Sequence, residues 1–139
     1  MKGSCINNIS FLEKAKNIKT LKLNYCPNIS NISSISKLDK LETLIINKTR
    51  IVDISFLERN KNIKHLELCK NHKVRFDINI DTHIKDFSPI SKLDKLEILH
   101  IEDENIFGLY FLENNKNIIN LNLNGCFYFN ILILHLYLN

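Results

Sequence analysis

Apolar residues recur along this chain at spacings near three, and within each segment the spacing then switches to two. In the first segment the apolar residues are Ile9, Leu12, Ile18, Leu21 and Leu23. Residues two apart lie on the same side of a β-strand, so Leu21 and Leu23 are expected to enter a core together. Spacing near three is typical of tight turns or of a short 3₁₀ or helical segment. Each segment is therefore predicted to form one short strand and one return path.

The pattern occurs five times, which predicts a stacked repeat protein. The first members of successive leucine pairs are 23, 22, 33 and 22 residues apart, so one insertion interrupts the period. We treat residues 1–139 as one domain, because such units bury their apolar edges only by stacking on neighbours. The apolar pairs are Leu21/Leu23, Leu44/Ile46, Leu66/Leu68, Leu99/Ile101 and Leu121/Leu123. The predicted repeats are 9–31, 32–53, 54–86 with an insertion at 74–84, 87–108 and 109–130, followed by an apolar tail at 131–139.

Two kinds of unit alternate along the chain. FLE units begin at Phe11, Phe56 and Phe111, and ISK units contain ISKLDKLE at residues 35–42 and 90–97. At one equivalent position the FLE units carry Ala15, Asn60 and Asn115, whereas the ISK units carry Leu38 and Leu93. The alternation indicates that a pair of units was duplicated.

The insertion, VRFDINIDTHI at 74–84, has its own pattern, because apolar and polar residues alternate from Val74 to Ile80. Alternation predicts a strand or a short β-extension. We interpret it as a packing element on the repeat array, and a second contact element is the alternative.

The repeat resembles the leucine-rich repeat, whose motif reads LxxLxLxxN/CxL. The stretch from Ile18 to Cys26 fits this motif, and the N/C position is filled in turn by Cys26, Thr49, Asn71, Glu104 and Cys126. The segments DISFL at 53–57 and DFSPI at 86–90 look like an element of internalin-type repeats. The alternating, nearly identical segments of this Ile-, Asn- and Lys-rich chain also resemble the leucine-rich repeat gene families of insect poxviruses. The resemblance implies an α/β leucine-rich repeat solenoid of about five repeats. Short parallel strands would line its concave face, and 3₁₀, irregular or short helical segments would return behind them.

The two ISK units differ at positions that point away from the predicted core. ISKLDKLETLII and ISKLDKLEILHI agree at ten of twelve positions, and the differences are Thr43 against Ile98 and Ile45 against His100. A constant repeat with variable outward residues is typical of a recognition surface, and drift of unconstrained exposed positions is the alternative. Outward Ile45 and Ile98 favour binding, because exposed apolar residues are a liability unless covered. The predicted partner-binding residues are Thr20, Lys22, Asn24, Thr43, Ile45, Asn47, His65, Glu67, Cys69, Ile98, His100, Glu102, Asn120, Asn122 and Asn124.

This pattern predicts a non-catalytic module that binds a protein partner of unknown identity. A shortened family copy with little retained function is the alternative. The chain contains no phosphate-binding glycine loop and no zinc-protease or nucleophile-elbow motif, so we expect neither an enzyme nor a cofactor.

A metal site at His65, Glu67, Cys69 and His100, with Glu102 beside them, is an alternative, because imidazole, thiolate and carboxylate groups bind zinc. The insertion separates the two predicted strands that carry these residues, and we expect an ordinary polar face with no metal.

Charge and cysteine content indicate which class of partner and which cellular compartment to expect. The net charge is +4 with mixed signs, which does not favour nucleic acid. The sequence has no signal peptide or membrane span, and its four cysteines show no metal-type spacing, so we expect free thiols in the cytoplasm and no membrane association. Cys26 and Cys126 are predicted to be buried, and Cys69 to be exposed and reactive.

Repeat arrays require polar caps, so self-association through uncapped ends is a further expectation.

Overall fold

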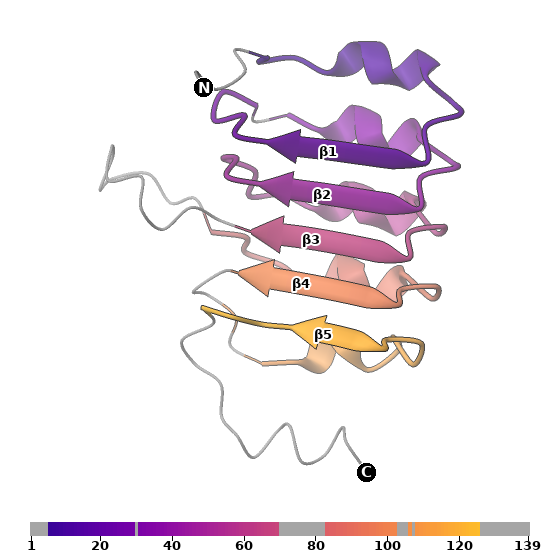
Figure 1. The fold of residues 1–139 in the computed structure, drawn as a ribbon, viewed down its shortest axis with the longest axis vertical. Helices are drawn as coiled ribbons and strands as arrows, with labels where there is room; N and C mark the ends of the chain where they lie inside the picture. The colour runs from indigo at the N-terminus through magenta and orange to yellow at the C-terminus, as the bar shows by residue number, and fades with distance from the viewer. Residues whose placement is uncertain (1–5, 30, 70–82, 103–105, 107, 126–139) are drawn as a thin grey trace.

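Five short parallel strands form a single sheet in chain order (Figure 1). The computed structural model describes residues 6–29, 31–69, 83–102, 106 and 108–125. Each strand contains the apolar pair that the sequence pattern assigned to it. The strands are β1 (Thr20–Asn24), β2 (Thr43–Asn47), β3 (His65–Cys69), β4 (Ile98–Glu102) and β5 (Asn120–Asn122).

One 3₁₀ helix precedes each strand, which confirms the interpretation of the spacing near three. These helices form a second layer behind the sheet (Figure 1). They are η1 (Ser10–Lys14), η2 (Ser33–Lys37), η3 (Ser55–Arg59), η4 (Ser88–Lys92) and η5 (Tyr110–Leu112). No helix among the described residues has the length and apolar character of a membrane span.

The sheet keeps its register across the insertion. Although β3 and β4 are separated by 33 residues instead of 22 or 23, His65 pairs with Ile98 and Cys69 with Glu102. Most of the insertion, including its predicted β-extension, lies outside the described residues. Ile84, at its end, is buried, so the chain returns directly into the core.

The core lies between the sheet and the 3₁₀ helices. The inward pairs of β2, β3 and β4 are all buried there. In the edge strands burial is incomplete: Leu21 is partly buried and Leu121 is 42% exposed, because each of these strands has a strand neighbour on one side only.

Each of the first four 3₁₀ helices is entered through the same side-chain turn. An Asn or Asp oxygen accepts the backbone N–H of the serine two residues later, at 2.7 to 3.0 Å. Such turns compete with regular structure and set the start of a return segment. The pairs are Asn8–Ser10, Asn31–Ser33, Asp53–Ser55 and Asp86–Ser88. This contact gives the Asp of the DISFL and DFSPI segments a structural role.

The chain turns sharply after the strands. Tyr25 and Lys48 adopt left-handed backbone conformations at equivalent positions, with φ of 57° and 56°. Cys26, the residue after Tyr25, is buried, and its Sγ donates to the carbonyl of Asn24. This is expected for the N/C position of the repeat. Thr49 is buried at the same place in the second unit. The other predicted members, Asn71, Glu104 and Cys126, lie outside the described residues.

A buried asparagine marks the junctions at which an FLE unit follows an ISK unit. Where an FLE unit follows an ISK unit, a buried asparagine amide donates to two carbonyls of the unit before it. Asn60 donates to Ile35 and Leu38, and Asn115 donates in the same way to Ile90 and Leu93. Two acceptors on one side fix the amide nitrogen toward them. This explains the polar residue that the sequence showed only as a difference between unit types.

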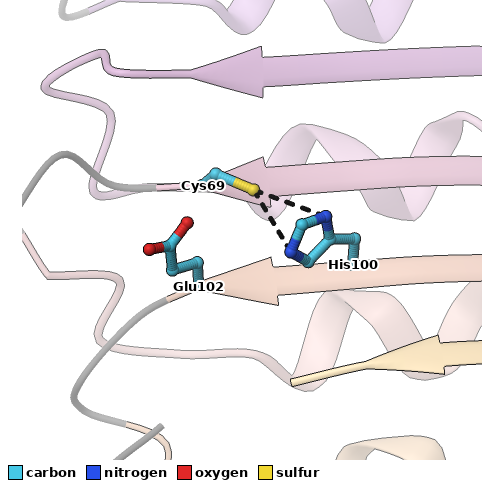
Figure 2. Close-up of side chains that lie close together, drawn as sticks. All are labelled: Cys69, His100 and Glu102. Atoms are coloured by element: carbon cyan, nitrogen blue, oxygen red, sulfur yellow. Dashed lines mark hydrogen bonds between the residues drawn. The ribbon is translucent and has the colours of Figure 1, made fainter. Parts of the chain in front are cut away.

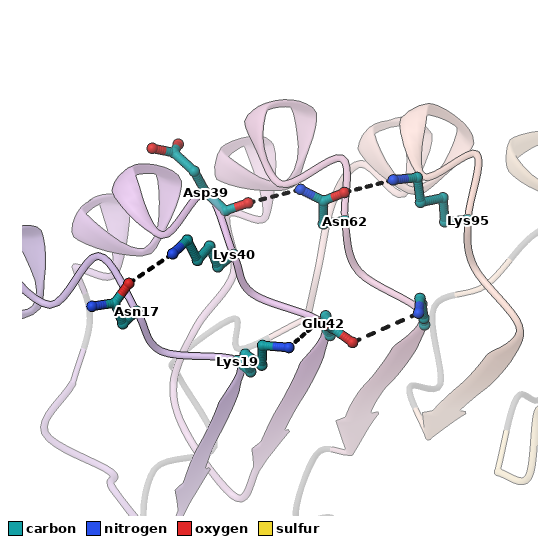
Figure 3. Close-up of polar contacts among 8 residues, drawn as sticks. Asn17, Lys19, Asp39, Lys40, Glu42, Asn62 and Lys95 are labelled. Atoms are coloured by element: carbon teal, nitrogen blue, oxygen red, sulfur yellow. Dashed lines mark hydrogen bonds and ion pairs between the residues drawn. The ribbon is translucent and has the colours of Figure 1, made fainter.

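Polar contacts also run from unit to unit near the beginnings of the strands (Figure 3). Glu42 of an ISK unit lies between Lys19 and Lys64 of the flanking FLE units, at 3.1 and 3.6 Å. Lys40 donates to Asn17 of the FLE unit before it, and Lys95 makes the same contact with Asn62. Charged side chains therefore alternate in sign around the first ISK unit, and both ISK units place a lysine against an asparagine of the FLE unit before them.

Candidate partner-binding face and side-chain cluster

The predicted outward residues share one face of the sheet, opposite the core. Strand register arranges them in rows of equivalent positions from β1 to β5. The first row is Thr20, Thr43, His65, Ile98 and Asn120. The second is Lys22, Ile45, Glu67, His100 and Asn122. The third is Asn24, Asn47, Cys69 and Glu102. We call these fourteen residues the concave face.

Asn124 was predicted to complete the third row, and this prediction is wrong. Strand β5 ends at Asn122, so Asn124 has no pairing with Glu102. Its backbone N–H instead donates to the side chain of Asn122 at 3.1 Å, in a turn.

Ile45 was predicted to be an exposed apolar contact, and the structure corrects this as well. Its side chain is only 8% exposed, although it points away from the core. Its register neighbours are Lys22 and Glu67, which are close enough to cover it. Ile98 is half-buried. Exposure is greatest on β1 and lower on the inner strands, because inner strands have neighbours on both sides.

Two ionisable side chains of β3 pair with each other. His65 Nε2 lies 2.9 Å from Glu67 Oε1, and both side chains are about one quarter exposed. This contact holds His65 next to Glu67, and His65 is not part of the cluster described next.

Three potential ligand side chains converge where β3 and β4 end. Figure 2 shows Cys69 beside His100 and Glu102, which project from the neighbouring strand toward it. The Cys69 sulfur lies 3.8 Å from each ring nitrogen of His100. One ligand atom from each of the three residues lies within 4.8 Å of the others. The metal site considered from the sequence therefore included two members of this cluster, Cys69 and His100. It also placed Glu102 next to these residues.

Cys69 was expected to be exposed and reactive, and its surroundings contradict this. The side chain is half-buried. Burial, followed by the carboxylates of Glu102 and Glu67, raises the pKa of the Cys69 thiol to about 12. A thiol in this environment is protonated at neutral pH and is a poor nucleophile. The Cys69–His100 pair therefore does not have the lowered thiol pKa that nucleophilic catalysis uses.

The return side offers a contrasting surface. A shallow open hollow lies between η2 and η3, lined by serines and by charged residues such as Glu58 and Arg59. Its charged side chains are exposed, whereas Ile32 and Phe56, which also line it, are buried. Its lining residues make no convergent cluster of ligand atoms among the described residues.

The parallel sheet, the single 3₁₀ return segments and the period of about 22 residues define a leucine-rich repeat solenoid. Comparison with solved structures supports this class. Internalin C2 from Listeria monocytogenes superposes with a TM-score of 0.73 at 22% identity, over 91% of this chain and 50% of the internalin. The internalin inlF from the same organism gives a TM-score of 0.63 at 20% identity, over 88% of this chain and 39% of the internalin.

The chain thus spans half or less of the length of these internalins. No family model matches the sequence, and no curated protein matches it. The fold and its internalin-like character are established by the structural likeness, whereas the resemblance to insect-poxvirus gene families stays a prediction.

Proposed function

We propose that this chain is a non-catalytic module that binds a protein partner on its concave face. One observation carries the proposal. The two ISK units are identical at ten of twelve positions, and both differences fall on the concave face, in adjacent rows of one sheet. The residues of these segments that face the core are constant, while the two that differ point to the opposite side of the sheet, as a surface fitted to a particular partner requires.

The chemistry of the concave face suits a protein partner better than a nucleic acid. Among its fourteen residues, Lys22 is the only lysine or arginine, and Glu67 and Glu102 are acidic. Phosphate backbones are bound chiefly by clustered lysine and arginine. Asparagine amides, imidazoles and carboxylates instead offer directional hydrogen bonds to a mixed protein surface.

The dimensions of the sheet limit the strength of this binding. Five strands spaced by about 4.8 Å, four of them five residues long and β5 three residues long, give a face of at most roughly 20 by 16 Å. A standard protein interface covers about 800 Å² on each partner. The concave face alone is smaller, so the contact extends over the adjoining turns or remains weak and transient.

A matched pair of variants tests the location of the contact. The concave variant is Lys22→Glu with Asn122→Lys, and the control on the return side is Lys14→Glu with Asn114→Lys. Both exchange the same residue types, and neither alters Cys69, His100 or Glu102. Far-ultraviolet circular dichroism first establishes that both are folded.

The measurement is recovery of a partner from lysate, with affinity then determined for the purified pair. Binding by wild type and the return-side control, with loss in the concave variant, supports the proposal. Equal loss in both, or loss only in the control, contradicts it. No partner for wild type favours the alternative of a shortened copy with little retained function.

A cytoplasmic location also remains a proposal. The described cysteines, Cys26 and Cys69, are free thiols, and this supports a reducing compartment. The experiment is thiol titration of protein purified from its native source under rapid alkylation, where oxidised cysteines would contradict the assignment.

A further inference from the structure

The cluster at the ends of β3 and β4 brings three kinds of ligand together on one face. Cys69 is the last residue of β3 and is paired with Glu102, the last residue of β4. His100 precedes Glu102 by two residues and therefore projects to the same side. The backbone that positions these groups is regular sheet, so the spacing does not depend on a loop.

The distances fit a small cation. Zinc bonds of about 2.0–2.3 Å in a tetrahedral arrangement place neighbouring ligand atoms roughly 3.3–3.7 Å apart. The three ligand atoms already lie within 4.8 Å of one another, and Cys69 Sγ is 3.8 Å from the His100 nitrogens. A shift of about 1 Å, achieved by rotating half-exposed side chains, completes the required spacing.

The ligand types select the class of metal. A thiolate together with an imidazole suits borderline or soft ions such as zinc, whereas calcium and magnesium prefer ligands that are all oxygen. Three protein ligands leave a fourth tetrahedral position for water or for a group of another molecule.

The electrostatic surroundings also favour a cation. The carboxylates of Glu102 and Glu67 lie beside Cys69 and His100 in the register of β3 and β4 and place negative charge at the cluster. The same negative potential attracts a divalent cation, and the cation can replace the thiol proton. Glu67 lies directly across from His100 in the register and is held by His65 at 2.9 Å.

We propose that Cys69, His100 and Glu102 form a zinc-binding site at the edge of the concave face. On binding, the Cys69 sulfur forms a bond to zinc and its proton passes to solvent, so no oxidant or reductant takes part. The three ligands belong to the concave face, but zinc binding is measured without a protein partner, so the two proposals are tested separately. The proposal departs from the expectation of no metal that the sequence alone supported.

The first experiment is zinc titration of the full chain by calorimetry, after treatment with a chelator and under reducing conditions. Repeating it in two buffers of different ionisation enthalpy counts the protons released. Cobalt serves as the spectroscopic probe, because a bound thiolate gives a sulfur-to-cobalt charge-transfer band. The expected result is one zinc per chain, net proton release and that band.

Matched variants then locate the ligands. Cys69→Ser, His100→Ala and Glu102→Gln remove the proposed ligands, while Cys26→Ser, His65→Ala and Glu97→Gln change the same residue types elsewhere. Substitutions outside the ligand shell of zinc sites cost about 10–100-fold in affinity, so loss of a ligand is expected to cost at least about 100-fold. Cys69→Ser is also expected to abolish the charge-transfer band.

Three results overturn the proposal: no zinc binding at micromolar concentration, binding that persists in Cys69→Ser and His100→Ala, or equal losses in the matched controls. Circular dichroism of each metal-free variant separates loss of a ligand from loss of the fold. If the Cys69→Ser chain is unfolded, Glu102→Gln with the cobalt spectrum decides the question, since the thiolate band should then shift or weaken while the fold is intact.

Discussion

Asn60 donates a side-chain hydrogen bond to the main-chain carbonyl of Leu38, the residue that holds the equivalent position one unit earlier. A second bond reaches the carbonyl of Ile35 at 3.0 Å, and Asn60 is only 2% exposed. Replacing Asn60 by Ala removes both bonds. Because each net hydrogen bond contributes about 0.5–1.5 kcal/mol, we expect a loss of about 1–3 kcal/mol in the free energy of unfolding.

Urea denaturation measures this loss, and Asn62→Ala is the control. Asn62, which precedes β3, also donates to a carbonyl of the preceding unit, that of Asp39, but it is partly exposed. We expect its replacement to cost less than about 0.5 kcal/mol. Equal losses for both variants would show that burial of Asn60 adds nothing to its hydrogen bonds.

Ile45 is expected to act on stability rather than on partner contact. It is 8% exposed, so Ile45→Ala removes about three buried carbon groups, worth about 2 kcal/mol at roughly 0.8 kcal/mol each. Lys22→Ala, on the same row, should change stability by less than about 0.5 kcal/mol. Thermal unfolding compares the two variants, and an unchanged melting temperature for Ile45→Ala would contradict the burial described above.

Glu42 is expected to titrate at low pH. A hydrogen bond and charge attraction from Lys19, followed by the charge of Lys64, hold the pKa of Glu42 below its ordinary value of 4.5. Its contribution to stability is therefore present above pH 4.5 and is lost as pH falls through the lowered pKa. An NMR titration of the Glu42 carboxyl measures this pKa directly.

The two lysines should not be equivalent in that titration. Lys19 is closer to Glu42, at 3.1 Å against 3.6 Å for Lys64. Lys19→Ala is therefore expected to move the pKa of Glu42 further toward 4.5 than Lys64→Ala does. The reverse order would mean that the Lys19 contact is not maintained in solution.

Cys69 is expected to resist alkylation at neutral pH in the metal-free chain. Its pKa is raised from 9.0 to about 12, so the neutral thiol stabilises the fold below pH 9.0 and this contribution is lost as pH rises toward 12. Peptide mass spectrometry after iodoacetamide treatment gives its rate of modification. Glu102→Gln should accelerate the reaction by lowering the thiol pKa, and a wild-type rate equal to that of an unfolded chain would contradict the assignment.

Much of the fold could be predicted from the sequence, because the spacing of apolar residues within each repeat indicates which residues form a strand and which form a turn. Leucine pairs two apart predicted each strand, and spacing near three predicted the 3₁₀ return segments. Fourteen of the fifteen proposed binding residues lie on the expected face, since alternation along a strand fixes the side to which each points. Their role in partner binding stays a prediction.

The errors concern features that depend on neighbours rather than on a residue's own position. Ile45 was placed on the correct face, but its burial depends on the side chains beside it in the rows. The low reactivity expected of Cys69 follows first from its burial and then from the carboxylates of Glu102 on the next strand and Glu67 on its own. The early end of β5, which removes Asn124 from the third row, had no signal in the leucine pattern.

The complementary contacts around Glu42 have a consequence for how such an array changes length during evolution. Loss of one unit would place two FLE units or two ISK units side by side, and would bring Lys19 against Lys64 or Glu42 against Glu97. Loss or gain of an adjacent FLE–ISK pair leaves every junction of the two types intact. Duplication by pairs is therefore the change in length that this architecture tolerates, and the copied segments at residues 35–46 and 90–101 are separated by that two-unit step.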